Sequence, residues 1–579
     1  MSDDLIVHTT SGPVRGFQAG DVCVWKGVPF AKPPVGNLRF QAPQPPDRWT
    51  EPRDARSFGP ASLQVENPVL SSVAGRGKLP QSEDCLYLNV WSKGADDKRR
   101  PVMVWIHGGS YLTGSGAIAW YDGAAFAKNG DVVVVTINYR LGALGYLYLG
   151  DLFGEAYAAS GNLGLLDQIA ALQWVHDNIA AFGGDPSRVT IFGESAGAGS
   201  VGALLAAPAA KGLFHRAILQ SGSGRLGIRT RASATEVAKR VLDKVGVAPG
   251  DVSALHAVPA ERFAEVGASL GAGLPFGPVM DGVVLPDFPP SALAAGAARD
   301  IPVMIGVNLD EYRLFTSYDP AWQSGDEAAL RSKLQSLLGP LPDAIIDFYL
   351  NEVPGESTYD RLMKLGTYRV FVRGMLQTAD LQAQQGAPVW AYRFDWKSTA
   401  FGGKLGACHA LEIPFVFNNL HQLGVERFTG DAPDRQPIAD HMHLAWIAFA
   451  HNGDPNDFTG VPQAATAGGG AVRGGAESGG AGVPSGAERS GAGLPSGAER
   501  SGAGLPSGVE RSGAGLPSGA ERSGAGLPIG VERSGAGLPH WPRYTLDKRE
   551  LLVFGSDPHV EQDPYAPERA AWERFVGEA

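Results

Sequence analysis

The feature that most constrains the fold is the stretch RVTIFGESAGAGS, residues 188–200. Its first five residues are rich in β-branched and aromatic side chains, which is typical of a strand. The alanine-rich run that follows, up to Leu205, is typical of a helix. Only Gly193, Glu194 and Ser195 separate the two, so the strand must turn sharply into the helix. The stretch therefore predicts a strand, a tight turn and a helix, with Ser195 at the turn.

Other segments repeat this alternation of strand and helix. The continuous apolar runs at 101–106 and 131–137 are typical of strands that are buried on both faces. Between residues 164 and 182, apolar side chains recur three or four positions apart and predict a helix. Further strands are expected at residues 216–221, 301–307 and 389–396, a late helix at 439–453 and a final strand at 550–555. The pattern predicts an α/β fold with a mostly parallel central sheet covered by helices.

Charge and composition exclude several classes of partner. The net charge of the 579 residues is −11, with no basic block, which argues against nucleic acid and anionic membrane surfaces as partners. No apolar stretch approaches a membrane span, and the N-terminal residues do not resemble a signal peptide, so we expect a cytoplasmic protein. Cys23, Cys85 and Cys408 are widely spaced and indicate neither a disulfide framework nor a zinc site.

A low-complexity repeat interrupts the second half of the chain. From Ser485 to Pro539, the unit SGAERSGAGLP recurs five times with a period of 11 residues. Three glycines and one proline in each unit disfavour a helix, and glycine does not recur every third residue as collagen requires. We therefore expect residues 467–538 to be a disordered, tolerated insertion. Residues 1–466 and 539–579 would then form a single domain.

The turn at Ser195 has the pattern of a nucleophile elbow. In such an elbow, a serine flanked as Gly193-Glu194-Ser195-Ala196-Gly197 is lifted clear of the sheet between a strand and a helix. A second copy of the pattern surrounds Ser269, but it follows the helical segment ERFAEV and lacks a preceding strand. Ser195 is therefore the candidate nucleophile, and Ser269 is interpreted as a surface or loop serine.

A serine nucleophile needs a base and an acid that orients the base. In this fold the chain order is serine, acid, histidine. His409 is the best placed histidine, because it lies in a loop just after the predicted strand 389–396, whereas His441 and His443 lie in the predicted late helix. Asp310 and Glu311 both follow the predicted strand 301–307, and spacing alone does not choose between them.

The reaction also requires donors for the oxyanion of the tetrahedral intermediate. The predicted strand 101–106 ends in His107-Gly108-Gly109-Ser110, small residues whose backbone N–H groups can point inward. Together with the N–H of Ala196, this segment predicts an oxyanion hole.

These motifs resemble the type B carboxylesterases of the α/β-hydrolase fold, a family that includes cholinesterases and bacterial para-nitrobenzyl esterases. The resemblance covers nearly all of the chain except the repeat, and the likeness is greatest to the para-nitrobenzyl esterase type. It is carried by KGVPFAKPPVGNLRF, SEDCLYLNV, VWIHGGSY, VVVVTINYRLGALGYL, GNLGLLDQIAALQWVHDNIAAFGGDP, VTIFGESAG, NLDEY, CHALEIPFVF, GDPN and HWPRYTLDKRE.

The resemblance implies a role for each candidate residue. Ser195 would be the nucleophile, Glu311 the acid and His409 the base, while the oxyanion donors would be Gly109, Ser110 and Ala196. No metal or cofactor is expected.

The resemblance also implies structural features and differences. It suggests structural ion pairs of Arg39 with Glu83 and of Arg140 with Asp167. In secreted members, the cysteine of the SEDC motif forms a disulfide, but its partner is missing here, so Cys85 should be a free, buried thiol. The tryptophan on which cholinesterases stack a quaternary ammonium is also missing, so a choline ester specialist is not expected.

The sequence thus predicts a serine carboxylic-ester hydrolase that acts through an acyl-enzyme on small to medium, fairly apolar esters. Amide or carbamate hydrolysis by the same residues is an alternative. A non-catalytic, neuroligin-like binding protein is another, although such members lack a complete triad. Tyr111, Phe276 and Phe315 are candidates for lining the pocket, with core packing an equal alternative. The sequence gives no indication of oligomeric state.

Overall fold

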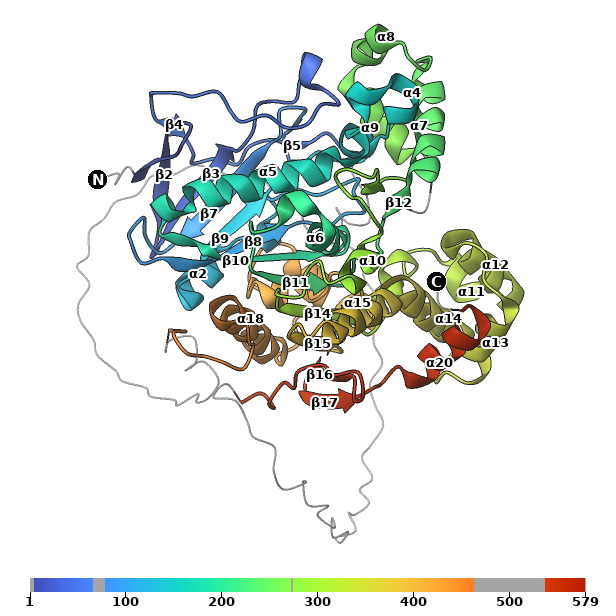
Figure 1. The fold of residues 1–579 in the computed structure, drawn as a ribbon. Coiled ribbons are helices and arrows are strands. Elements are labelled where there is room, and N and C mark those ends of the chain that lie inside the picture. The colour runs from blue at the N-terminus through green and yellow to red at the C-terminus, as the bar shows by residue number, and fades with distance from the viewer. Residues whose placement is uncertain (1–4, 66–78, 272–273, 463–536, 578–579) are drawn as a thin grey trace, which may run out of the picture. The chain divides into compact units, whose positions relative to one another are not determined.

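A thirteen-stranded sheet runs through the residues that the structure describes, and its central strands are parallel (Figure 1). The computed structural model describes residues 5–65, 79–271, 274–462 and 537–577. The strands of the sheet, in chain order, are β1 (Leu5–His8), β2 (Pro13–Ala19), β3 (Val22–Pro29), β4 (Arg53–Asp54), β7 (Tyr87–Ser92), β8 (Arg100–Ile106), β9 (Val133–Ile137), β10 (Gly184–Glu194), β11 (Arg216–Gln220), β14 (Val303–Asn308), β15 (Val389–Phe394), β16 (Glu550–Phe554) and β17 (His559–Gln562). Two-stranded sheets pair β5 (Ala61–Ser62) with β6 (Gln81–Ser82), and β12 (Arg229–Thr230) with β13 (Val279–Met280).

The parallel part of the sheet confirms the predicted fold class. Neighbouring strands follow the order β9, β8, β10, β11, β14, β15 and β16, and each pair is parallel. The edges are antiparallel, with β1, β2, β3 and β7 on one side and β17 on the other. Because parallel strands have their carboxyl ends at the same edge, the loops after β8, β10 and β14 meet there.

One prediction about the strands is wrong. The segment at 550–555 does form β16, but it is not the final strand, because β17 pairs with it antiparallel. The sequence HVEQ of β17 contains one apolar residue, and its side chains are exposed or half-buried. An edge strand of this kind lacks the apolar pattern that identifies a strand from sequence.

The central strands are continuously apolar because both faces of the sheet are covered. Val102 and Val104 of β8 pack into one core, whereas Met103 and Trp105 pack into a second core on the other face. The helices α5 (Leu163–Asn178), α6 (Ala196–Ala206) and α15 (Arg373–Gln384) supply the first core. The second core is supplied by α2 (Ala124–Gly130), α16 (Ile413–Val416) and α18 (Arg435–Asn452), and Figure 1 shows α2 and α18 on that side of the sheet.

The remaining helices extend the two ends of the sheet. Helices α7 to α9 lie together with α4, and helices α11 to α14 lie together with α20 (Figure 1). Their bounds, with those of α3, α10 and α17, are α3 (Gly142–Tyr146), α4 (Gly150–Phe153), α7 (Arg231–Val245), α8 (Val252–Ala257), α9 (Ala260–Ala268), α10 (Pro289–Ala294), α11 (Ala321–Ser324), α12 (Glu327–Leu338), α13 (Asp343–Asn351), α14 (Thr358–Thr367), α17 (Val425–Thr429) and α20 (Ala566–Phe575). No helix among the described residues is long and apolar enough to cross a bilayer.

Structural details implied by the resemblance are confirmed. Arg140 Nη2 lies 2.7 Å from Asp167 Oδ1, and both side chains are buried. Arg39 Nε lies 2.5 Å from Glu83 Oε1. Cys85 is a free, buried thiol.

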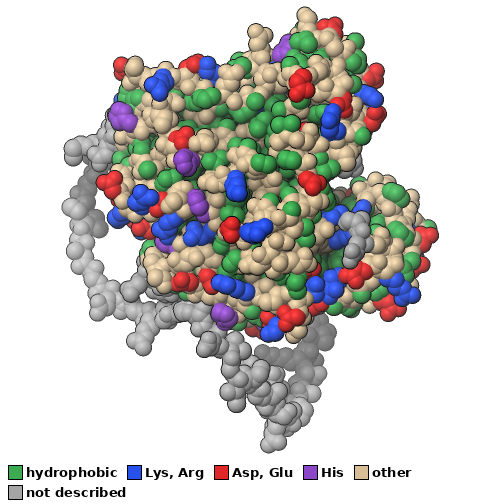
Figure 2. All heavy atoms as spheres, viewed as in Figure 1, with side chains coloured by type: hydrophobic (Ala, Val, Ile, Leu, Met, Phe, Trp, Pro, Cys, Tyr) green, Lys and Arg blue, Asp and Glu red, His purple; other side chains and the backbone are tan. Residues whose placement is uncertain are grey.

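On the face shown in Figure 2, acidic and basic side chains are interspersed.

The predicted insertion, residues 467–538, lies outside the described residues except for Gly537 and Leu538. Its disorder and the domain boundaries at 466 and 539 therefore stay predictions.

Candidate active site

Ser195 occupies the turn between β10 and α6. Its backbone has φ 57° and ψ −122°, a left-handed conformation that costs a non-glycine residue energy. The two flanking glycines make this turn possible. A Cβ on Gly193 would lie 2.6 Å from the Ile106 carbonyl oxygen, and a Cβ on Gly197 would lie 2.0 Å from the same atom. Only glycine therefore lets the turn approach β8 this closely.

The turn presents Ser195 to a cavity of about 630 Å³. The side chain is half-buried, and the cavity wall next to it includes Ser110 and Ala196. Apolar side chains such as Leu226, Ile228, Phe315 and Phe371 line the rest of the wall, together with several arginines. A nucleophile at the wall of a cavity of this size is accessible to a small molecule.

His409 contacts Glu311, the carboxylate that the family resemblance implies as the acid. His409 Nδ1 lies 2.6 Å from Glu311 Oε2, and the second carboxylate oxygen accepts the Asn308 N–H at 2.7 Å. Glu311 is fully buried and begins the short 3-10 turn that follows β14. Asp310 instead accepts the Ala407 N–H at 3.0 Å and faces Arg313. The structure thus distinguishes the two carboxylates that spacing left open.

The other side of the imidazole faces a second carboxylate. His409 Nε2 lies 3.0 Å from Glu194 Oε1. Within the described chain, no hydrogen bond joins the Ser195 hydroxyl to His409 Nε2. Without substrate, hydrogen bonds between catalytic groups are often long or poorly aligned, and they tighten when substrate binds. The aromatic rings of Phe315 and Phe371 pack on His409, with centroids 5.3 and 4.7 Å from that of the imidazole.

The charge balance between His409 and Glu194 shifts the pKa of each group. Burial alone would lower the pKa of His409, but the carboxylates of Glu194 and Glu311 outweigh it and raise the pKa to about 9. Burial raises the pKa of Glu194 to about 8, although His409 opposes this effect. Because the two groups are in contact, their titrations are coupled, and each step belongs to the pair.

A third buried carboxylate, Glu412, lies behind the site. Asn308 Nδ2 donates to it at 2.6 Å and Gln220 Nε2 at 3.1 Å. Burial raises its pKa, and the nearby Glu311 adds to this effect. Asn308 thus bonds to Glu311 through its backbone and to Glu412 through its side chain.

Sequence reasoning missed Glu194 and Glu412 as members of the site. Glu194 lies inside the pentapeptide that identified Ser195, so its position next to the nucleophile was a usable signal. Glu412 follows His409 by three residues in the otherwise apolar segment ALEIPFVF, where a carboxylate must be buried.

The predicted oxyanion donors lie next to Ser195. Among the described residues, the backbone N–H groups of Gly109, Ser110 and Ala196 donate to no acceptor. Gly109 and Ser110 have φ values of 111° and 60°, and Gly108 lies directly against the nucleophile, since a Cβ there would be 3.0 Å from Ser195 Cβ. Free donors beside a serine nucleophile match the requirement for an oxyanion hole.

The other candidates from the sequence lie elsewhere. Ser269 follows α9, and its hydroxyl donates a hydrogen bond to the Val266 carbonyl, which fits its interpretation as a surface or loop serine. His443 is buried in α18, and its Nδ1 lies 2.8 Å from the Val416 carbonyl oxygen. Phe315 lines the cavity, whereas Tyr111 and Phe276 are fully buried in the core.

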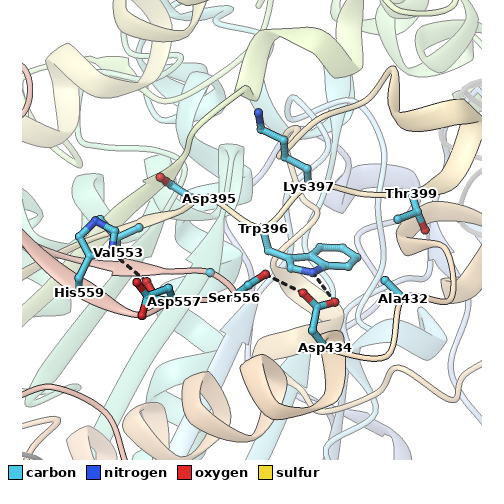
Figure 3. A pocket seen from close by; sticks show the side chains of 11 residues that line it. Asp395, Trp396, Lys397, Thr399, Ala432, Asp434, Val553, Ser556, Asp557 and His559 are labelled. Atoms are coloured by element: carbon cyan, nitrogen blue, oxygen red, sulfur yellow. Dashed lines mark hydrogen bonds between the residues drawn. The ribbon is translucent and has the colours of Figure 1, made fainter. Parts of the chain in front are cut away.

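A second pocket, of about 400 Å³, lies at the ends of β15 and β16 (Figure 3). Its serine, Ser556, donates to Asp434 at 2.6 Å. The ring nitrogens of His559 lie 2.8 Å from the Asp557 carbonyl oxygen and 3.2 Å from a Glu561 carboxylate oxygen. Because both nitrogens are already engaged, His559 is not available as a base for Ser556. The cavity at Ser195 is therefore the candidate active site.

The described residues contain no group of three or more histidine, cysteine or acidic side chains arranged to bind a metal ion.

Comparisons with known proteins agree with this geometry. The model of the carboxylesterase family matches residues 3–467. The para-nitrobenzyl esterase of Bacillus subtilis (strain 168) is 43% identical over 464 residues, which cover 78% of this chain and 90% of that protein. The phenmedipham hydrolase of Pseudarthrobacter oxydans is 38% identical, with the same coverage.

Solved structures give the same result. The crystal structure of the Geobacillus stearothermophilus carboxylesterase EST55 superposes with a TM-score of 0.77 at 46% identity, covering 98% of this chain and 99% of that one. The sheet, the serine at its turn and these relatives together show that the chain belongs to the carboxylesterase family, has the α/β-hydrolase fold and hydrolyses carboxylic esters.

Proposed function

We propose that the chain hydrolyses small to medium, fairly apolar esters through the triad Ser195, His409 and Glu311. The observation that carries the proposal is the strained serine at the cavity wall beside a histidine bonded to a buried glutamate. The apolar side chains around the cavity, and its volume of about 630 Å³, favour an acyl or alcohol group of modest size.

In the first half of the reaction, His409 accepts the proton of the Ser195 hydroxyl at Nε2. The serine oxygen attacks the ester carbonyl, and a tetrahedral intermediate forms. Its oxyanion accepts hydrogen bonds from the N–H groups of Gly109, Ser110 and Ala196, each worth about 3 kcal/mol in such sites. Glu311 accepts a hydrogen bond from the Nδ1–H group and stabilises the imidazolium. His409 then donates its Nε2 proton to the leaving alcohol, which leaves an acyl-enzyme.

In the second half, a water molecule replaces the alcohol. His409 accepts a proton from the water, and the resulting hydroxide attacks the acyl carbon. The same three N–H groups stabilise the second oxyanion. Collapse of this intermediate releases the carboxylic acid and returns the proton to Ser195 Oγ. Amide or carbamate hydrolysis would use the same groups, but the esterase names of several relatives favour the ester.

The test is hydrolysis of para-nitrophenyl acetate and butyrate by the wild type, by Ser195→Ala and by Ser269→Ala. Ser269 is the matched control, because it lies in the second copy of the same pentapeptide. We expect turnover by the wild type and by Ser269→Ala, and a fall to background in Ser195→Ala. Full activity in a folded Ser195→Ala variant would contradict the proposal.

A further inference from the structure

Four arginine side chains line the cavity that contains Ser195. Arg225 and Arg229 follow β11, Arg369 lies in η8, a π-helical turn at Tyr368–Val372, and Arg373 begins α15. The proposed ester chemistry uses none of them. Single π-helical turns inside α-helices occur frequently at functional sites.

Arg225 and Arg369 contact neutral groups. Arg225 donates from Nη1 to Gln377 Oε1 at 2.8 Å, and its guanidinium carbon lies 5.3 Å from the ring centroid of Phe288. The guanidinium carbons of Arg369 and Arg373 lie 5.7 and 5.4 Å from the ring of Trp572. The contacts of Arg225 and Arg369 hold these two side chains in position and supply no negative charge.

The arginines also act on one another. Burial lowers the pKa of Arg225, and the charges of Arg373 and Arg369 lower it further. Burial and then Arg373 lower the pKa of Arg369. In the described part of the chain, no carboxylate oxygen lies within 4.0 Å of Arg225 or Arg369. Although the net charge of the protein is −11, positive charges gather at this cavity.

Convergent positive charges in a half-buried cavity favour an anion. Guanidinium groups bind a carboxylate through charge-assisted, often bidentate, hydrogen bonds. A bound carboxylate would relieve the mutual repulsion of the arginines and pair groups that are partly removed from water. Arg369 and Arg373 are four residues apart on one helical segment, a spacing at which two side chains lie on the same side.

We propose that the preferred substrates of this esterase carry a carboxylate group, which Arg225 and Arg369 bind while Ser195 attacks the ester carbonyl. The inference rests on the ester hydrolysis proposed above and refines its substrate class to an otherwise apolar ester that carries one carboxylate group. The carboxylate is not consumed, because the bond that breaks is that between the acyl carbon and the alcohol oxygen.

The experiment compares matched pairs of esters. For the acyl side, the mono-4-nitrophenyl ester of adipic acid is compared with the 4-nitrophenyl ester of adipic acid monoamide. For the alcohol side, the butyrate ester of 4-hydroxybenzoate is compared with that of 4-hydroxybenzamide. Each pair differs by a carboxylate against a neutral amide of similar shape. Rates are measured at pH 7.5 and corrected with Ser195→Ala.

We expect the wild type to have a kcat/KM about tenfold or more higher for the charged member of at least one pair. In Arg225→Gln and Arg369→Gln, this ratio should fall toward one, and in Arg369→Lys it should be partly retained. The ratio is informative even if a variant is partly unfolded, because the fraction of active enzyme cancels. Arg299→Gln is the matched control, since Arg299 is exposed and outside the cavity, and it should keep the wild-type ratio.

Two results overturn the inference alone. One is Ser195-dependent turnover of the neutral esters without preference for either charged ester. The other is a preference that both Arg225→Gln and Arg369→Gln retain in full. If a folded wild type hydrolyses none of the four esters, the proposed function itself fails. A preference that weakens as the salt concentration rises would further support an ionic contact.

Discussion

His409 lies between two buried carboxylates, and this arrangement sets the pH dependence of the site. Glu311 bonds to Nδ1, while Glu194 lies against Nε2, the nitrogen that accepts the serine proton in the proposed mechanism. A general base works only when it is unprotonated. Because the pKa of His409 is raised to about 9, kcat/KM should increase as the pH rises through a pKa above the usual value for histidine.

Substitution Glu194→Gln should move this rise in kcat/KM to lower pH. The substitution removes the negative charge next to Nε2, so the protonated form of His409 loses a stabilising partner and its pKa falls. We expect a shift of about one pH unit or more in the acidic limb of the profile of kcat/KM against pH, measured with para-nitrophenyl butyrate.

Glu412→Gln is the matched control for this prediction. Glu412 is also a buried carboxylate, but its effect on the pKa of His409 is smaller than those of Glu194 and Glu311. The acidic limb of the pH profile of Glu412→Gln should therefore shift less than that of Glu194→Gln. An unchanged limb in Glu194→Gln, or a shift to higher pH, would show that Glu194 does not control the protonation of His409.

At the scale of elements, the junction of β10 and α6 is the part of the fold that places Ser195, the proposed nucleophile. The chain contains the Gly-x-Ser-x-Gly pattern twice, around Ser195 and around Ser269, so the structural requirements of the turn can be compared between two copies of the same pattern. In the first, a Cβ on Gly193 would meet backbone atoms, the Ile106 carbonyl oxygen at 2.6 Å and the Gly197 carbonyl carbon at 2.7 Å. In the second, a Cβ on Gly267 in α9 would meet a side-chain atom of Phe276 at 3.1 Å.

Gly193→Ala should therefore destabilise the protein much more than Gly267→Ala. Backbone atoms of β8 and α6 cannot move away without disrupting the sheet, so we expect a loss of about 1–3 kcal/mol or more in the free energy of unfolding. Gly267→Ala should stay within about 1 kcal/mol of the wild type, because better helix propensity offsets the contact with Phe276. Urea unfolding followed by circular dichroism measures both. Equal stability of the two variants would refute the assignment of Gly193 to a close backbone approach.

At the scale of the whole molecule, the two ends of the predicted insertion are held by contacts within one core. The backbone N–H of Trp541 donates to Asn456 Oδ1 at 2.8 Å, and Asn456 Nδ2 donates to the Trp541 carbonyl at 2.9 Å. Val461 and Leu538 belong to the same hydrophobic core. The chain on either side of the repeat is therefore anchored independently of the repeat.

Deletion of residues 467–537 should leave ester turnover within a few-fold of the wild type. Closing a shorter loop costs less conformational entropy. For a length change of this size the difference is only about 2 kcal/mol, and it stabilises the deletion variant. The measurements are kcat/KM for para-nitrophenyl butyrate and the melting temperature of the deletion variant and the full chain. Loss of folding or of activity on deletion would show that the repeat contributes to the structure or the function.

Much of the site could be predicted because its signals are local. The strand, the glycines and the helix around Ser195 are adjacent in the sequence, and so are the small residues after β8 that supply Gly109 and Ser110. His409 and Glu311 required more, namely the chain order of the fold and, for Glu311, a family resemblance. Local spacing could not separate Asp310 from Glu311, because the direction of each side chain depends on how the end of β14 packs against the loop that carries His409.

The sequence by itself determined the α/β class, the parallel central strands and the candidate nucleophile, because periodic patterns and turn residues act between near neighbours in the chain. Only the tertiary structure decided that Glu194 faces His409, that β17 closes the edge of the sheet, and that Arg225 and Arg369 meet at the cavity of Ser195. Those contacts join segments far apart in the chain, and their positions depend on the packing of both cores. No local pattern of residues encodes such a meeting, since charge and burial at a cavity arise only when the whole chain is folded.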